Sequence, residues 1–130
     1  PGGSVTAGLA LIDTMQSLDC PVTTVGEGVV ASMAAVILAC GDHRQVYRHT
    51  QVLIHQLMGG TGMAQQTDIE IAAQHTATMR AELDELLAEH GNLSAQEFHE
   101  LTERDCWCNA KRALELGLVD EVIAPSKKAL

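Results

Sequence analysis

The chain has no long apolar run and little positive charge, and both shortages limit what it does. No apolar run reaches the roughly 18 residues that indicate a membrane-spanning helix, and no basic stretch precedes an apolar segment as in a signal peptide. Eight Lys and Arg residues stand against 17 Asp and Glu residues, so the net charge is -9. This balance disfavours nucleic acid and anionic membranes as partners. We expect the partners to be proteins or small molecules.

Cysteine is also scarce. Four cysteines are too few and too scattered for a disulfide scaffold, and they favour a reducing compartment, so we expect a cytoplasmic protein. Cys106 and Cys108 form a C-x-C pair and not the C-x-x-C pair of zinc ribbons. We therefore expect partly buried thiols there, a packed Trp107 between them, and neither a metal nor a cofactor.

The chain lacks an initiator methionine and opens on Pro1-Gly2-Gly3, which is typical of an interior turn. Its 130 residues are the size of one domain. We expect residues 1–130 to form a single domain that is part of a longer polypeptide and lacks its N-terminal portion.

Strand-like and helix-like segments alternate along the chain. Residues 22–25 are predicted to form a buried strand, and the apolar run 31–39 a short helix that ends at Gly41. Further strands are predicted at 45–47, 51–56 and 118–123. Further helices are predicted after a cap at Ser4 or Thr6, after a capping box at Ser94 and Glu97, and from about Asn109 to Gly117. The alternation predicts an α/β layered fold.

One predicted helix, 67–90, is unusually long. Thr67 and Glu70 match a capping box at its start, and Gly91 follows its end. Apolar residues recur along it, which suits burial between subunits or packing within one subunit. Residues 125–130 are predicted to form a frayed tail.

Ser32 is the candidate nucleophile. It stands among small residues between a strand and a helix, where the free backbone N–H of Met33 could stabilise an oxyanion and Gly3 could supply a second N–H. A serine hydroxyl also needs a base, and His55 and Asp105 complete a possible triad. Each of the three has a structural interpretation as well: a helix cap, a packed or solvated strand-end histidine, and a cap or ion-pair partner. The other five histidines are expected to be solvated.

Several motifs occur in the order found in ClpP, the caseinolytic serine peptidase family, and the chain resembles that family from residue 1 to about 124. The motifs are Pro1-Gly-Gly-Ser-Val-Thr-Ala-Gly8, Asp13-Thr-Met15, Ala31-Ser-Met33, Ile54-His-Gln56, Gly59-Gly60, Thr67-Asp-Ile-Glu-Ile71, Glu103-Arg-Asp105 and Gly117-Leu-Val-Asp120. The resemblance implies a ClpP/crotonase-like fold of repeated strand-helix units with a protruding long helix, called the handle.

The resemblance also implies a mechanism. Ser32, His55 and Asp105 would hydrolyse peptide bonds through an acyl-enzyme, with Gly3 and Met33 as the oxyanion hole. Extended peptide would bind as an added strand between two backbone segments. These segments consist of Gly3, Ser4, Val5, Thr6, Leu57, Met58, Gly59, Gly60 and Thr61.

ClpP-like chains form two stacked heptameric rings that receive unfolded polypeptides from a Clp-family AAA+ unfoldase, so the resemblance implies these partners. A second reading is a catalytically silent subunit or inactive fragment of a Clp ring, because Leu57 stands where the family usually has proline. A third is a crotonase-like acyl-CoA enzyme, which also uses paired backbone N–H groups. A serine-lysine signal-peptide peptidase is disfavoured because no lysine precedes Lys111.

Overall fold

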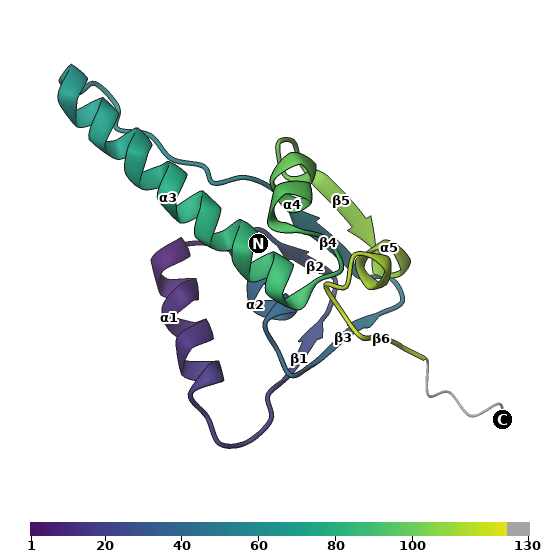
Figure 1. Cartoon of the computed structure of the whole chain (residues 1–130). Coiled ribbons are helices and arrows are strands. Elements are labelled where there is room, and N and C mark those ends of the chain that lie inside the picture. The colour runs from purple at the N-terminus through teal and green to yellow at the C-terminus, as the bar shows by residue number, and fades with distance from the viewer. Residues whose placement is uncertain (125–130) are drawn as a thin grey trace, which may run out of the picture.

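The computed structural model describes residues 1–124, in which helices and strands alternate (Figure 1). In chain order the elements are α1 (Val5–Gln16), β1 (Thr23–Gly26), β2 (Val29–Ala31), α2 (Met33–Ala39), β3 (His43–Tyr47), β4 (Gln51–Ile54), α3 (Gln66–His90), α4 (Ala95–Leu101), β5 (Cys106–Asn109), α5 (Ala110–Glu115) and β6 (Glu121–Ile123). The α/β class expected from the sequence is confirmed. The tail predicted at 125–130 lies outside the described residues.

The strands form two three-stranded sheets. In one, β3 lies between β1 and β6, and both pairs are parallel. In the other, β4 lies between β2 and β5, and it is parallel to β2 and antiparallel to β5. Strands β2 and β5 were not predicted from the sequence. The first has only three residues, and the second has no β-branched residue, so neither carries a clear strand signal.

Helix α2 occupies the centre of the core. Five of its seven residues are buried, and none is charged, as expected for a helix surrounded by protein. Ile12 of α1, Leu87 of α3 and Phe98 of α4 belong to the same buried cluster. The helix that carries the residue after Ser32 is therefore held from several sides.

Two predictions of burial, for the whole of strand 22–25 and for Trp107, are wrong for the same reason. Successive side chains of a strand point to opposite faces. Thr24 of β1 donates a hydrogen bond to the Leu38 carbonyl oxygen, 2.7 Å away, while Val25 is 50% exposed. In β5, Cys108 is buried as expected, but Trp107 points the other way and is exposed.

Helix α3 extends far beyond the rest of the chain, as Figure 1 shows, which confirms the predicted handle. It begins at Gln66 after an N-cap at Gln65 that makes no side-chain capping hydrogen bond, so the box predicted at Thr67 is wrong. The box predicted at Ser94 and Glu97 is confirmed. Within residues 1–124, no helix combines the length and apolarity needed to cross a membrane.

Two other predicted elements are also revised. Residue 31 belongs to β2, so the helix predicted from there begins at Met33. The strand predicted at 118–123 is limited to β6, because Asp120 is tied to Arg44: its N–H donates to the Arg44 carbonyl oxygen at 2.7 Å, and its carboxylate accepts from the Arg44 N–H at 2.9 Å.

Candidate active site

The register of the second sheet brings the three triad candidates to one edge. Strand β4 pairs Leu53 with Ala31 of β2, and Ile54 with Cys106 of β5. Continuing each register by one residue places Ser32 beside Ile54 and His55 opposite Asp105. Residues far apart in the chain therefore meet where β2 and β4 end and β5 begins.

Ser32 has an unusual backbone conformation. Its φ of 59° and ψ of -130° make it the only non-glycine residue with positive φ in the described part of the chain. The Ser32 N–H donates to the Leu53 carbonyl oxygen at 2.8 Å, which fixes this turn onto β4. Its side chain sits at the N-cap of α2 but makes no capping hydrogen bond. Such strained residues persist where the surroundings impose them and cluster at functional sites.

The N-terminal segment packs against this turn through Gly2. At its φ of 90°, a Cβ atom on Gly2 would lie 2.6 Å from the Ala31 carbonyl oxygen and 2.7 Å from the Ser32 Cβ. Only glycine fits this close approach without movement of the neighbours. The contact places Gly3, the next residue, at the cavity beside Ser32.

A cavity of about 110 Å³ adjoins Ser32. Its lining includes His55 together with Gly3 and Met33, the two residues whose N–H groups are predicted to form the oxyanion hole. Met33 is the first residue of α2, so its N–H has no acceptor four residues earlier in the helix. The structure therefore gathers the candidate nucleophile, the candidate base and two candidate oxyanion donors around one space.

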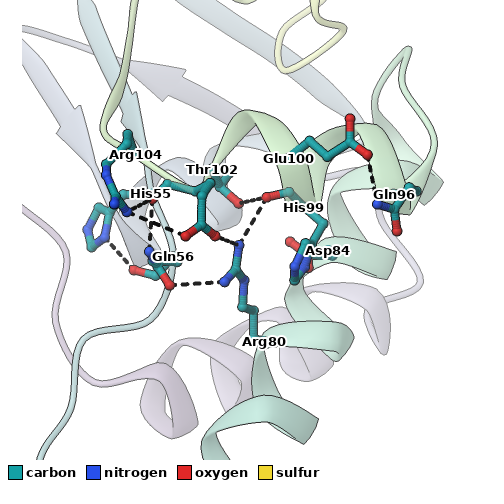
Figure 2. Close-up of polar contacts among 10 residues, drawn as sticks. His55, Gln56, Arg80, Asp84, Gln96, His99, Glu100, Thr102 and Arg104 are labelled. Carbon is teal, nitrogen blue, oxygen red and sulfur yellow. Dashed lines mark hydrogen bonds and ion pairs between the residues drawn. The ribbon is translucent and has the colours of Figure 1, made fainter.

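Asp105 is placed differently. It is exposed, and it lines a second, more open hollow of about 600 Å³ together with His55. The Nδ1 atom of His55 lies 2.5 Å from the Gln56 carbonyl oxygen (Figure 2). Among residues 1–124, no hydrogen bond joins the side chains of Ser32, His55 and Asp105. The three are neighbours, but the triad is not closed in this structure.

The segment after His55 is tied to the segment before Asp105. The Gln56 N–H donates to the Thr102 carbonyl oxygen, and its side-chain amide donates to the Glu103 carbonyl oxygen, each at 2.9 Å. Arg80 of α3 donates to the Gln56 side-chain oxygen at 2.9 Å and to a Glu103 carboxylate oxygen at 3.1 Å (Figure 2). The hydrogen bond from Arg80 is the main reason that the pKa of Glu103 is lowered.

A second polar contact joins α3 to α4. The Nδ1 atom of His99 lies 2.7 Å from Oδ2 of the buried Asp84. The prediction that His99 is solvated is therefore wrong for its Nδ1 atom, because α4 packs against α3. His90 was also expected to be solvated, yet its Nε2 is sealed from solvent.

Gln56, Arg80 and Asp84 were not predicted from the sequence as residues of the site. A signal was available for the last two, because Arg80 and Asp84 are four residues apart and Leu87 follows three residues later, so all three share one face of α3. The sequence did not show that this face lines the cavity beside Ser32.

Of the residues expected to bind extended peptide, Gly3, Val5, Leu57 and Met58 line the cavity. Gly3 and Ser4 precede α1, whereas Val5 and Thr6 form part of its first turn. Residues 57–61 lie outside helices and strands, and Met58 is 84% exposed. Within the described part of the chain, no group of three His, Cys, Asp or Glu side chains is arranged to hold a metal ion.

Comparison with known proteins adds an independent observation. The family model described as Clp protease matches residues 1–126. An ATP-dependent Clp protease proteolytic subunit of Lactococcus lactis subsp. lactis (strain IL1403) is 43% identical over 126 residues, which cover 95% of this chain and 63% of that protein. A protein of the same name from Streptococcus pneumoniae (strain Hungary19A-6) is 44% identical over 127 residues, which cover 95% of this chain and 65% of that protein. The chain thus spans slightly less than two thirds of the length of these relatives.

Proposed function

Because the chain belongs to the Clp protease family, we propose that it is a serine endopeptidase subunit with Ser32, His55 and Asp105 as its catalytic triad. The observation that carries this proposal is the shared cavity: Ser32 and His55 line it together with Gly3 and Met33. Nucleophile, base and oxyanion donors must surround one reacting carbonyl, and this arrangement supplies such a space.

The chemistry follows from these positions. Ser32 Oγ attacks the scissile carbonyl, and His55 Nε2 takes the hydroxyl proton and later returns it to the leaving amine. The N–H groups of Gly3 and Met33 stabilise the oxyanion of the tetrahedral intermediate. Asp105 orients the imidazole and stabilises its charged form.

Closure of the triad requires His55 Nδ1 to exchange the Gln56 carbonyl oxygen for the Asp105 carboxylate. The present contact already favours the tautomer with the proton on Nδ1, which leaves Nε2 free to act as the base. A carboxylate adds the negative charge that a carbonyl lacks. The exchange is local, because His55 and Asp105 line the same hollow.

We further propose that the substrates are unfolded polypeptides, delivered by a Clp-family AAA+ unfoldase to two stacked heptameric rings. Support comes from the handle, which carries two exposed apolar side chains near its start: Ile69 is 47% exposed and Ile71 is 63% exposed. Exposed apolar side chains on a projecting helix suit contact with another subunit. Native mass spectrometry of the intact protein tests the number of subunits.

The second candidate function is a catalytically silent ring subunit. It is favoured by the His55 contact with Gln56 and by the open triad. Hydrolysis of fluorogenic peptides by the intact protein separates the two candidates. A serine endopeptidase cleaves them and the Ser32→Ala variant does not, whereas a silent subunit gives equal background rates for both proteins.

A further inference from the structure

The cavity beside Ser32 contains a buried carboxylate. Helix α3 forms one wall of the cavity through Arg80, Leu83, Asp84 and Leu87. The side chain of Asp84 is only 8% exposed. A charge so far removed from water is costly unless it is paired or serves a purpose.

Only one oxygen of this carboxylate is occupied. Oδ2 lies 2.7 Å from His99 Nδ1, while Oδ1 accepts no hydrogen bond from residues 1–124. Within these residues, Arg80 Nε and His90 Nε2 are the side-chain polar atoms that are both inaccessible to solvent and without a hydrogen-bond partner. Asp84 Oδ1 is not one of them. The free oxygen is therefore still reachable, and the space that Asp84 lines is the cavity beside Ser32.

The neighbouring guanidinium does not occupy this oxygen. Arg80 directs Nη1 to the Gln56 side-chain oxygen, and Nη2 to the His99 carbonyl oxygen and the Glu103 carboxylate. Its charge is thus paired with Glu103, at 3.1 Å. Asp84 remains available to a donor that enters from the Ser32 side.

The rest of this wall is largely apolar. Val36, Ile54, Leu83 and Leu87 all line the cavity. A space of about 110 Å³ holds one side chain. The best match is a side chain with an apolar stem and a cationic end, because the stem packs on the aliphatic wall and the end reaches a carboxylate.

We infer that Asp84 is a specificity-determining residue that favours lysine or arginine at the substrate residue whose carbonyl Ser32 attacks. Asp84 Oδ1 accepts a hydrogen bond from the basic side chain, while Oδ2 stays in contact with His99 Nδ1. The inference rests on the proposed function, since it assumes that Ser32 is the nucleophile. It also gives the buried carboxylate a role that hydrolysis itself does not require.

Two fluorogenic peptides that differ only at this residue, Lys in one and Met in the other, provide the test. The readout is the ratio of their kcat/KM values with the intact protein, so any general loss of activity cancels. The wild type favours the Lys peptide by at least about tenfold, and Asp84→Asn reduces this preference by a similar factor. Glu85→Gln, at the adjacent exposed position of α3, loses the same charge and keeps the ratio.

A variant at His99 separates recognition from structural support. If Asp84 serves only to hold α4 onto α3, His99→Gln changes the ratio as much as Asp84→Asn does. Recognition by Asp84 predicts that His99→Gln retains the Lys preference, because the carboxylate is still present.

The remaining outcomes distinguish this inference from the proposed function. If a fluorophosphonate labels Ser32 and the Met peptide is cleaved, but Lys is not preferred, the inference about Asp84 is wrong and the proposed function stands. If Ser32 is not labelled and neither peptide is cleaved, the proposed function is wrong and the inference falls with it.

Discussion

The imidazole of His55 faces two acceptors that compete for one nitrogen: Nδ1 lies 2.5 Å from the Gln56 carbonyl oxygen, although the strand register places His55 opposite Asp105. Both acceptors set the same tautomer. They differ in charge, and only a carboxylate strongly stabilises the imidazolium that forms during hydrolysis. We expect the active site to form when His55 Nδ1 exchanges the Gln56 carbonyl oxygen for the Asp105 carboxylate.

The first prediction concerns Asp105. Asp105→Asn lowers the kcat of peptide hydrolysis by about 10⁴-fold, as expected when the carboxylate of a Ser-His-Asp triad is lost. Asp19→Asn, at an exposed position away from the cavity, leaves the rate unchanged. Steady-state kinetics on one fluorogenic peptide provides the measurement. A loss of less than tenfold would show that the Gln56 carbonyl oxygen alone supports His55.

The second prediction separates the chemistry of Ser32 from its place at the N-cap of α2. Because the Ser32 side chain makes no capping hydrogen bond, Ser32→Ala changes the free energy of unfolding by less than about 0.5 kcal/mol. Ser94→Ala is the matched comparison. It removes a complete capping box and costs about 1 kcal/mol. Urea unfolding monitored by circular dichroism measures both, and an equal loss would mean that the Ser32 hydroxyl has a structural role.

The third prediction concerns pH and Asp120. Hydrogen bonds from Arg44, at 3.0 Å to Oδ2 from the side chain and 2.9 Å from the backbone N–H, lower the pKa of Asp120. The ion pair therefore contributes stability that is fully present above the unfolded-state pKa of about 3.9. The contribution is lost as the pH falls through the lower pKa of the folded state.

Asp120→Asn consequently destabilises the protein at pH 7 and has little effect on stability at the lowest pH where folding is still measurable. Thermal unfolding of both proteins across this pH range checks the sign. A difference in stability that grows as the pH falls below 4 would contradict the assignment.

The fourth prediction concerns thiol reactivity. Burial is the main cause that raises the pKa of Cys40 to about 11 and that of Cys108 to about 12. At pH 8 both thiols are therefore almost entirely protonated and react poorly. Cys20 is exposed, so a thiol-reactive disulfide reagent modifies it rapidly in the native protein.

Cys20→Ser removes this rapid phase, whereas Cys40 and Cys108 react at full rate only in denaturant. Rapid modification of Cys40 or Cys108 in the folded protein would show that the end of α2 or strand β5 opens far more often than the burial of these thiols indicates.

The positions of the candidate residues along the chain could be predicted more reliably than their contacts. Local patterns predict the segments that carry Ser32 and His55, and they predict all five helices of residues 1–124. Strand β5 was not predicted, because Cys-Trp-Cys-Asn has weak strand propensity. Without β5, nothing in the sequence itself pairs residue 54 with residue 106, and the approach of Asp105 to His55 rests on that register.

The contact between Asp84 and His99 was missed for a related reason. Each residue belongs to a helix whose apolar pattern predicts the helix but not its neighbour. Their pairing depends on how α3 and α4 pack, which is a tertiary property. The same limit applies to the chemistry of the cavity wall, because a buried aspartate and a solvated one look alike in a sequence.

Covalent labelling shows whether Ser32 is an activated nucleophile, as the proposed function requires. The intact protein is treated with a fluorophosphonate, digested, and mapped by mass spectrometry. The proposed function predicts one adduct per chain, located on Ser32 and absent from the Ser32→Ala variant. An unmodified Ser32 in the assembled protein, or the same extent of labelling in Ser32→Ala, would contradict it.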